Sequence, residues 1–448
     1  MNILPPVPIL VENEVSEEYD ILSREMWNHE DNGIELNDAQ ESALSSTNLA
    51  RSADPSWSAA GGSEDRDFIY EMVEADDGSI IIAGSVFVDC WLGSIVVQTK
   101  GLGDIIVAKL DRNGTWLWAK STGTAIAYDE ARGVALDDDG DVYITGYING
   151  TVEFGDTTLE SNGFDGYFAK MNGSNGNWIY AINYGGFDVD VGWDLVVDSD
   201  ENVYVTGFYQ NNTVFGPHIL QGGNPSSNEK FFIAKYNNTA PEPWLWAYTA
   251  VGEDLSVGFQ LVLDDQDNIY VVGYNTGTVR WHQNSFSSTA TGNWNGFLLK
   301  YNTSGSFQWG KAVGTNSCFG TSCGVYFNNV VIDSQQRIIV GGNQIGDVAI
   351  DGGHQGIGNW DIAVSRWQAD GTHDWWAVTG SSRDDRVQAL AVNPQDRPVV
   401  GGWLGGSAQF GSYLLSNVTG DSDFFIAQLY TDGTWDWAVK MGGSGDDT

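Results

Sequence analysis

Short runs in which apolar and polar residues alternate follow one another along most of the chain, and this pattern predicts half-buried β-strands. One stretch shows the unit well, with an apolar run at 133–136, an Asp-Asp-Asp-Gly turn at 137–140 and a run of β-branched and aromatic residues at 141–147. Two further strand-like runs follow at 165–171 and 177–183. Because turn residues separate the runs, the unit is predicted to be four short antiparallel strands without a helix.

This unit recurs. An aromatic residue followed by a small one appears seven times, at intervals of 61 to 67 residues. The pairs are Trp57-Ser58, Trp118-Ala119, Tyr180-Ala181, Trp246-Ala247, Trp309-Gly310, Trp376-Ala377 and Trp437-Ala438. The predicted repeats are about 61–122, 123–184, 185–250, 251–313, 314–379 and 380–441, and 442–448 begins a further, truncated repeat. Such a period is typical of solenoids, propellers or arrays.

The repeat length favours a β-propeller. A lone four-stranded sheet cannot bury both faces, so neighbouring sheets must cover it. A β-sandwich needs about seven strands per ~100 residues, whereas this period holds four strands in about 60. We therefore predict an all-β propeller of four-stranded antiparallel blades, occupying 57–448, with six complete blades plus the outer strand of a seventh.

The seventh blade raises a question of closure. Trp57 is predicted to begin its outer strand, and the segment 442–446 repeats the pattern of 61–65. We therefore interpret the chain as a truncated or partial product whose missing strands follow Thr448. The alternative is that six blades close the ring and one terminal strand is redundant. Either arrangement exposes a blade edge, which is expected to self-associate.

Further repeat positions carry a family resemblance. A Phe-Gly step occurs at Phe154, Phe215 and Phe410, and Ala-Lys occurs at Lys109, Lys170 and Lys235. With the recurring Gly-Gly, Asp-x-x-Gly and Tyr-Val-Thr-Gly-like segments, the chain resembles the β-propeller repeat of large bacterial and archaeal surface or secreted proteins. The resemblance implies the fold and a secreted or cell-surface location. It implies no catalytic residues, and propellers host unrelated activities.

The net charge of the chain makes some classes of binding partner unfavourable. The chain has 60 acidic and 20 basic residues, a formal net charge of −40. Such a surface repels nucleic acid and anionic membranes. No apolar run approaches the ~18 residues needed to cross a bilayer, so membrane insertion is not expected. Five of the cations share one repeat position, which predicts that they pair with blade carboxylates. These are Lys109, Lys170, Lys235, Lys300 and Arg366.

Residues 1–56 differ from the repeats. They carry twelve acidic residues against Arg24 and Arg51, with little β pattern. Such a composition predicts a disordered acidic segment. No cationic stretch precedes an apolar core there, so no secretory signal is visible. The secreted or cell-surface location therefore depends on the family resemblance.

Three cysteines do not make a disulfide scaffold. Cys318 and Cys323 lie in an insertion of the fifth repeat, where they predict a small disulfide loop in an oxidising compartment. Two reduced thiols are the alternative. Cys90 is left without a partner.

Calcium at the first hairpin of the blade is the strongest candidate for chemistry, because oxygen ligands at alternate positions of a tight loop suit a hard cation. The residues are Asp137, Asp139 and Asp141 in one repeat and Asp198, Asp200 and Asn202 in the next. The alternative is that the same residues are ordinary turn residues. No other cofactor and no catalytic residue is assigned, since the five histidines are scattered and acidic pairs such as Asp384-Asp385 fall at recurring repeat positions.

The predicted function is a non-enzymatic extracellular or cell-surface scaffold for binding or adhesion to a glycan or protein partner. A polysaccharide hydrolase or lyase with a site at the propeller mouth is the alternative. A pyrroloquinoline quinone-type oxidoreductase is a third reading, because the segment 110–116 resembles the tryptophan-docking motif of those propellers, although no cofactor site is visible. The cysteine insertion and the long connections 210–229 and 276–294 are where a site is expected.

Overall fold

The structure is a computed structural model, and within its described part every regular element is a β-strand or an isolated bridge. The described residues are 59–222, 229–252, 254–281, 286–289, 294–317, 323–348, 350, 353–416 and 422–442. The acidic segment 1–56 and the predicted start of a seventh blade at Trp57 lie outside them. No helix in the described ranges is long and apolar enough to cross a membrane.

Six four-stranded antiparallel sheets, here sheets 1 to 6, account for most of these strands. Sheet 1 contains β2 (Asp67–Glu74), β3 (Ile80–Val86), β6 (Asp104–Leu110) and β7 (Trp116–Thr122). Sheet 2 contains β8 (Glu130–Leu136), β9 (Val142–Phe154), β10 (Thr157–Met171) and β11 (Trp178–Tyr184). Sheet 3 contains β12 (Asp190–Val197), β13 (Val203–Tyr209), β16 (Lys230–Tyr236) and β17 (Trp244–Thr249). Sheet 4 contains β18 (Ser256–Leu263), β19 (Ile269–Asn275), β22 (Asn295–Tyr301) and β23 (Phe307–Val313). Sheet 5 contains β25 (Gly324–Ile332), β26 (Ile338–Ile345), β28 (Asp361–Trp367) and β29 (His373–Thr379). Sheet 6 contains β30 (Asp385–Val392), β31 (Pro398–Leu404), β34 (Asp423–Leu429) and β35 (Trp435–Met441). The predicted unit and the propeller class are confirmed.

The second and third strands of each sheet are joined by a connection that carries additional strand structure. In sheet 2 the extended ends of β9 and β10 form it, and Val152, Phe154 and Leu159 bury their side chains there. The other small strands are β1 (Gly61–Gly62), β4 (Cys90–Leu92), β5 (Ile95–Val97), β14 (Asn212–Phe215), β15 (His218–Gln221), β20 (Thr278–Trp281), β21 (Phe286–Thr289), β24 (Thr315–Ser317), β27 (Asp347–Val348), β32 (Ala408–Phe410) and β33 (Tyr413–Leu415).

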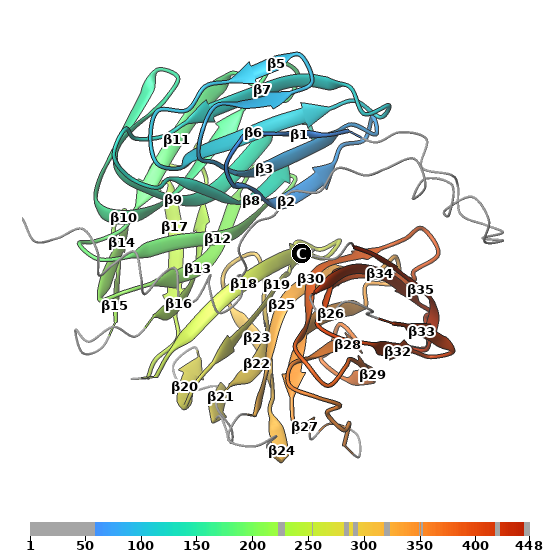
Figure 1. Cartoon of the computed structure of the whole chain (residues 1–448). Helices are drawn as coiled ribbons and strands as arrows, with labels where there is room; N and C mark the ends of the chain where they lie inside the picture. The colour runs from blue at the N-terminus through green and yellow to red at the C-terminus, as the bar shows by residue number, and fades with distance from the viewer. Residues whose placement is uncertain are drawn as a thin grey trace, which may run out of the picture.

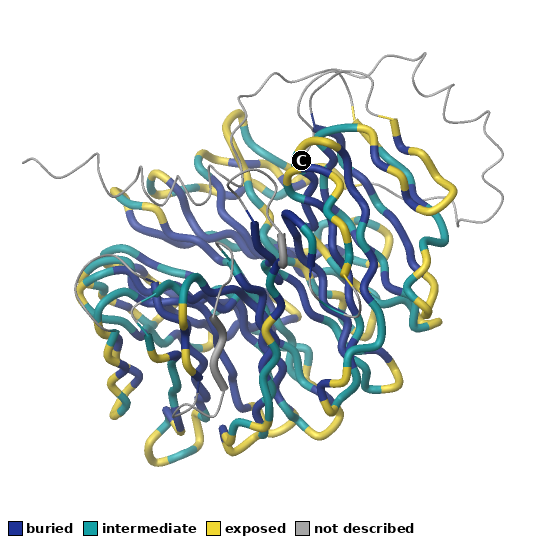
Figure 2. Tube along the Cα trace, turned by 90° about the horizontal axis from the view of Figure 1, so that it is seen from below, coloured by how far each residue is buried: buried dark blue, intermediate teal, exposed yellow. Residues whose placement is uncertain are grey.

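The sheets follow one another around an arc, from blue to red in Figure 1. The first strand of each sheet lies on the inside of the arc, and β8 contacts β12, β12 contacts β18, and β18 contacts β25. The fourth strands lie on the outside. Buried residues run through the middle of the sheets, while exposed ones gather at the turns (Figure 2).

Sheet-against-sheet packing makes the core. Tyr204 and Ile233 of sheet 3, each 0% exposed, belong to one apolar cluster with Leu261 and Val271 of sheet 4. The other sheet boundaries have similar clusters. At each boundary, apolar side chains of both sheets are removed from water by the same contact, and this burial stabilises both sheets.

A recurring polar contact accompanies this packing. In sheet 1 the Lys109 ammonium and the Trp118 indole N–H both donate to the Gly173 carbonyl of sheet 2, each at 3.2 Å. Lys300 and Trp309 of sheet 4 donate in the same way to the Ala369 carbonyl of sheet 5, at 3.3 and 3.2 Å. We call this contact the latch. It fixes the outer part of one sheet to a turn of the next.

The cations at the repeat position of Lys109 were predicted to pair with carboxylates, and four of the five do so. Lys170 lies 2.9 Å from Asp137, and Lys300 lies 3.4 Å from Asp264. The remaining pairs are Lys235 with Asp198 at 3.6 Å and Arg366 with Asp374 at 3.0 Å. The repeat therefore places a carboxylate beside this cation in four sheets.

One predicted repeat anchor is wrong by a residue. In sheet 5, Trp375 pairs across the strands with Arg366, and Trp376 pairs with Ser365. Trp375 thus takes the position of Trp118, and its indole N–H donates to the Thr431 carbonyl of sheet 6 at 3.1 Å. Because two tryptophans are adjacent, the sequence alone did not show which one is equivalent to Trp118. The hydrogen bond of the latch identifies Trp375.

Removing Lys170 tests how much a buried ion pair at this repeat position contributes to stability. Lys170→Ala is expected to lower the free energy of unfolding by about 3–5 kcal/mol, because it leaves the buried Asp137 carboxylate without its counter-charge. Lys100→Ala is the control, since Lys100 and Glu153 are 3.8 Å apart with side chains 47% and 68% exposed. That variant is expected to lose about 1 kcal/mol or less. Equal losses in urea denaturation would contradict the prediction.

Candidate functional site

The first strand of every sheet has a register shift at the same place, and one residue is bypassed there. The bypassed residues are Tyr70, Arg132, Trp193, Phe259, Asn328 and Gln388. A bulge re-aims its side chain out of the regular alternation of the strand. Because the first strands line the inside of the arc, the bulges gather these side chains near the axis.

Arg132 shows how closely they meet. Its guanidinium lies 4.0 Å from the centre of the Tyr70 ring and 4.8 Å from that of Trp193, so sheets 1, 2 and 3 each supply one member. An arginine near aromatic faces gains a cation–π attraction. Glu130 balances the charge, with its carboxylate 2.5 Å from the guanidinium.

A line of aromatic rings continues from Trp193. The Trp193 and Phe259 centroids are 5.4 Å apart, and Phe259 stacks on Tyr274 at 5.5 Å. Tyr326 follows at 6.1 Å from Tyr274, and Trp360 at 4.9 Å from Tyr326. At the far end the guanidinium of Arg386 lies 4.7 Å from the Trp360 ring. We call Tyr70, Trp193, Phe259, Tyr274, Tyr326 and Trp360 the axial aromatic row.

Most of the row is open to water on part of its surface. Trp193, Phe259, Tyr326 and Trp360 are partly exposed, whereas Tyr274 is buried at 8%. Each of the six sheets contributes either a ring of the row or one of the two arginines, Arg132 and Arg386. Partly exposed rings with a few charged groups are the composition of a small-molecule or glycan site.

A pair of carboxyl groups follows the bulges. Glu71 and Asp194 stand one residue after Tyr70 and Trp193, and they are hydrogen-bonded to each other. Glu71 Oε2 accepts the Val134 N–H at 2.7 Å, and Asp194 Oδ2 accepts the Leu261 N–H at 2.9 Å. Each carboxyl therefore binds the first strand of the following sheet.

Gln260 occupies the same position in sheet 4 and extends the network. Its Oε1 accepts the Val330 N–H at 2.7 Å, and its Nε2 donates to Glu71 at 3.3 Å. In sheet 2 the position is Gly133, where a Cβ would lie 2.9 Å from Asp194 Cα. Because Gly133 has no side chain, Asp194 has room to lie close to the first strand of sheet 2.

Burial raises the pKa of both carboxyls. The pKa of Asp194 rises to about 7, mainly because the group is desolvated. Desolvation, followed by the charge of Asp194, raises the pKa of Glu71 well above its usual range. Two touching carboxyls resist a double negative charge, so the pair retains a proton close to neutral pH.

The residues predicted to bind calcium lie in two hairpin turns. Asp137 Oδ1 accepts the N–H groups of Asp139 and Asp141 at 3.1 and 2.8 Å, while Oδ2 faces the Lys170 ammonium. An incoming calcium ion would therefore compete with Lys170 for the Asp137 carboxylate.

The second turn is built in the same way. Asp198 Oδ1 accepts the N–H groups of Asp200 and Asn202, at 3.0 and 2.8 Å, and Oδ2 accepts the Tyr204 hydroxyl at 2.8 Å. Within the described ranges no group of three or more His, Cys, Asp or Glu side chains is placed to hold a metal ion. Calcium binding stays a prediction.

Only one of the two cysteines in the predicted disulfide loop lies in the described part of the chain. Cys323 is disulfide-bonded, and Cys318 lies outside the described residues. Cys90 is a free thiol with 0% exposure. Burial raises its pKa to about 11, which keeps it protonated and unreactive.

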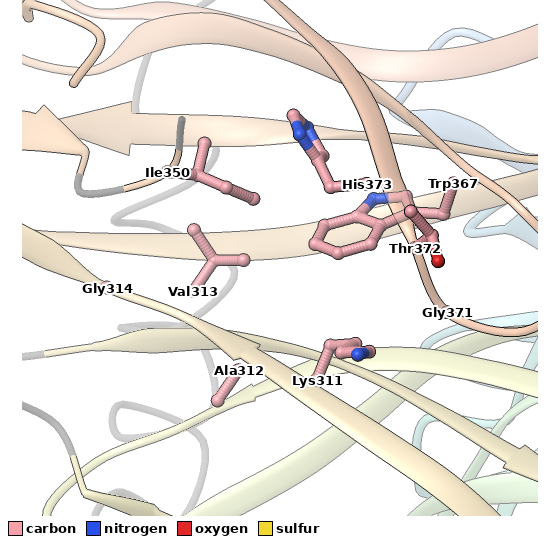
Figure 3. A pocket seen from close by; sticks show the side chains of 9 residues that line it. All are labelled: Lys311, Ala312, Val313, Gly314, Ile350, Trp367, Gly371, Thr372 and His373. Atoms are coloured by element: carbon pink, nitrogen blue, oxygen red, sulfur yellow. The ribbon is translucent and has the colours of Figure 1, made fainter. Parts of the chain in front are cut away.

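A surface pocket of about 360 Å³ lies beside the fourth strands of sheets 4 and 5. Figure 3 shows the side chains that line it. It is bounded by Lys311 and Val313 of β23, by Ile350, and by Trp367 and His373 of sheet 5. The figure shows Ile350 and Val313 facing the Trp367 ring. The pocket is mainly apolar and brings no acid–base pair together.

Comparison with known proteins agrees with this architecture. A family model described as a β-propeller repeat, SBBP, matches residues 117–152, which run from β7 into the long β9. The chain contains an SBBP β-propeller repeat. This confirms the resemblance to a β-propeller repeat.

The relatives of this chain are distant. A WD repeat-containing protein of Acanthamoeba polyphaga mimivirus is 25% identical over 234 residues, covering 44% of this chain and 17% of that protein. A solved Lactobacillus plantarum protein is 12% identical, with 76% and 92% coverage and a TM-score of 0.35. Xylan β-1,4-xylosidase from Bacillus halodurans is 11% identical, with 80% and 84% coverage and a TM-score of 0.31. The chain thus spans less than a fifth of the curated relative's length.

Sequence reasoning missed the axial aromatic row. The site was expected in the cysteine insertion and the long connections, whereas most of the row lies on strands next to the axis. Tyr70, Arg132, Trp193 and Phe259 share one position of the repeat but differ in chemistry. A fixed position whose side chain changes from repeat to repeat was the signal that could have revealed it.

The carboxyl pair predicts a specific pH dependence. The folded pair binds its proton more tightly than separated carboxyls with pKa values of about 4. The free energy of unfolding should therefore fall as pH rises from about 4 to above 7. Glu71→Gln should reduce this loss by on the order of 2 kcal/mol, measured as urea denaturation at pH 5 and pH 8.

The exposed Glu160 supplies the control. Glu160→Gln should keep the pH dependence of the unchanged protein. If Glu71→Gln behaved like this control, the shared proton would be excluded as the cause.

Proposed function

We propose that this protein is a non-enzymatic extracellular or cell-surface scaffold that binds a glycan at the axial aromatic row. The observation that carries the proposal is the partly exposed series Trp193, Phe259, Tyr326 and Trp360, which ends at an arginine on either side. Aromatic faces cover the apolar faces of sugar rings, and the polar groups at their margins fix orientation. The secreted or cell-surface location follows from the family resemblance.

Charge favours a neutral ligand. Arg132 is paired with Glu130 at 2.5 Å, and Arg386 lies 3.9 Å from Asp384, so neither arginine brings an unbalanced positive charge. The whole chain carries a formal charge of −40, which repels anionic polymers. A neutral oligosaccharide therefore suits the row better than an acidic one.

The carboxyl geometry argues against a glycosidase. Retaining and inverting glycosidases hold their two carboxyls about 5 to 9.5 Å apart, with the substrate bond between them. Glu71 and Asp194 instead contact each other, and each also accepts a backbone N–H. Their role is to join the first strands of neighbouring sheets.

The tryptophan-docking segment is likewise structural. Asp111 Oδ1 accepts the N–H groups of Asn113 and Thr115, each at 2.8 Å, and Trp116 begins β7. These contacts build the turn between β6 and β7. They supply no observation that favours a quinone-dependent oxidoreductase.

A glycan array probed with the full chain tests the proposal. Binding to a neutral oligosaccharide is expected, and Trp193→Ala should weaken it at least tenfold because a central ring is lost. Trp193→Phe, which retains a ring, should recover part of the affinity. Trp91→Ala is the control, since Trp91 is 50% exposed in β4, away from the row.

Two results would contradict the proposal. One is release of reducing sugar from a polysaccharide panel. The other is glycan binding that Trp193→Ala and Trp91→Ala lower equally, with both variants melting as the unchanged protein does.

A further inference from the structure

Two buried carboxyls lie side by side between sheets 2 and 3. Phe164 of β10 forms a parallel bridge with Val189, which precedes β12, so the next residues on the two strands, Asp165 and Asp190, are neighbours. Their side chains belong to residues that are 6% and 0% exposed. Neither forms an ion pair with a lysine or arginine in the described part of the chain. Desolvation raises the pKa of Asp190 to about 8, and the charge of Asp165 adds to this rise.

Three buried oxygen atoms at this place have no hydrogen-bond partner among the described residues. They are Oδ1 of Asp165, Oδ1 of Asp190 and the hydroxyl oxygen of Thr213, which lies near Asp190 and is 0% exposed. The other oxygen of Asp190, Oδ2, accepts the Gly186 N–H at 2.9 Å. Burying oxygen atoms without a partner costs free energy, so a partner of positive charge is expected here.

The boundary between sheets 1 and 2 shows what is different. Asp129 occupies the position of Asp190 there, and it accepts the N–H and the hydroxyl of Thr124 at 2.6 and 2.8 Å and the Asn149 N–H at 2.8 Å. Between sheets 2 and 3 the residue equivalent to Thr124 is Gly186, which has no hydroxyl. The carboxyl of Asp190 has therefore been kept while one of its donors has been lost.

The two carboxyls occur together or not at all. Three of the five sheet boundaries have an acid at both positions, and the other two have an acid at neither. The acidic pairs are Asp104 with Asp129, Asp165 with Asp190 and Asp361 with Asp385, and the others are Lys230 with Ser256 and Asn295 with Val325. Joint presence is expected of groups that share one bound charge.

A surface loop covers the pair between sheets 2 and 3. Gly185 lies against it, and a Cβ at this glycine would be 2.4 Å from Asp165 Oδ1. Phe187, two residues further along the same loop, is 86% exposed. The carboxyls thus lie directly beneath a loop that faces water.

We propose that Asp165, Asp190 and Thr213 bind one hard divalent cation, calcium or magnesium, between sheets 2 and 3. Carboxylate and hydroxyl oxygens suit such ions, and water supplies the remaining ligands, as at many magnesium sites. The two charges of the ion balance the two carboxylates. The site is separate from the hairpin turns of Asp137 and Asp198, whose carboxylates already face lysines.

Metal removal and return test the proposal. The full chain is freed of metal with a chelator and then titrated with calcium or magnesium chloride. One of the two ions is expected to raise the melting temperature by about 3–5 °C at about 100 times its Kd. Asp165→Asn and Asp190→Asn should each abolish this rise, because each removes a charged ligand while retaining the shape of the side chain.

Asp385→Asn is the matched control, since it makes the same substitution at the equivalent position between sheets 5 and 6. The Asp385 carboxyl already accepts hydrogen bonds from Ser381 and Gly405. This variant should keep the rise in melting temperature, whatever its starting stability. A rise that survives in Asp190→Asn would overturn the proposal and place the ion elsewhere.

Terbium luminescence gives a second readout that does not depend on stability. Terbium binds at calcium sites and emits when a nearby aromatic ring is excited, and Tyr184 lies near Asp190. Emission should appear on titration of the unchanged chain, should be displaced by calcium, and should fall at least tenfold in Asp190→Asn but not in Asp385→Asn. Equal emission from the two variants would contradict the site. A melting temperature that responds to pH but to neither cation would also contradict it and assign the balancing charge to a proton.

Discussion

A four-stranded sheet has two apolar faces and cannot cover either one alone, and the architecture of this protein follows from that constraint. Each sheet between neighbours loses water from both faces, as the 0% exposure of Tyr204 on one face of sheet 3 and of Val205 on the other illustrates. Packing alone would permit neighbouring sheets to slide. The latch, in which Lys109 and Trp118 share the Gly173 carbonyl, adds a directional contact to the non-directional hydrophobic one. Register between sheets therefore depends on the latch at the outer edge together with the side-chain hydrogen bonds between neighbouring first strands.

The same constraint shapes the axis. First strands that converge leave too little room for a full set of inward side chains, and the bulge in each strand redirects one residue per sheet. Where the redirected residue is aromatic, it joins a row that links several sheets. The residue after the bulge binds the next strand, as Glu71 and Asp194 do. Scaffold and candidate site thus use adjacent positions of one strand.

Much of the fold could be predicted from the sequence, because its signals are local and repeated. The structure confirms the four-strand unit, its turns at Asp137 and Asp198, and four of the five predicted cation–carboxylate pairs. The choice between Trp375 and Trp376 failed because it depends on a contact with Thr431 in the next sheet. The axial aromatic row was missed for the same reason. Tyr70, Trp193 and Trp360 are far apart in the chain, and no local pattern shows that they meet.

The structure shows how the few basic residues of this acidic chain are used. A formal charge of −40 is carried with only 20 basic residues, and several of these are used within the scaffold as latch cations or beside aromatic rings. Few positive charges are then left for the surface. Self-repulsion of such a surface opposes compact folding, so the inter-sheet packing must outweigh it.

Comparing one substitution at two equivalent positions tests the central claim most directly. Ile233 and Ile426 occupy the same position in sheets 3 and 6, but only Ile233 is covered by a following sheet. Packing between sheets predicts that Ile233→Ala lowers the free energy of unfolding by about 2–5 kcal/mol, whereas Ile426→Ala lowers it by about 1 kcal/mol or less. Equal losses at the two positions in urea denaturation would contradict the account.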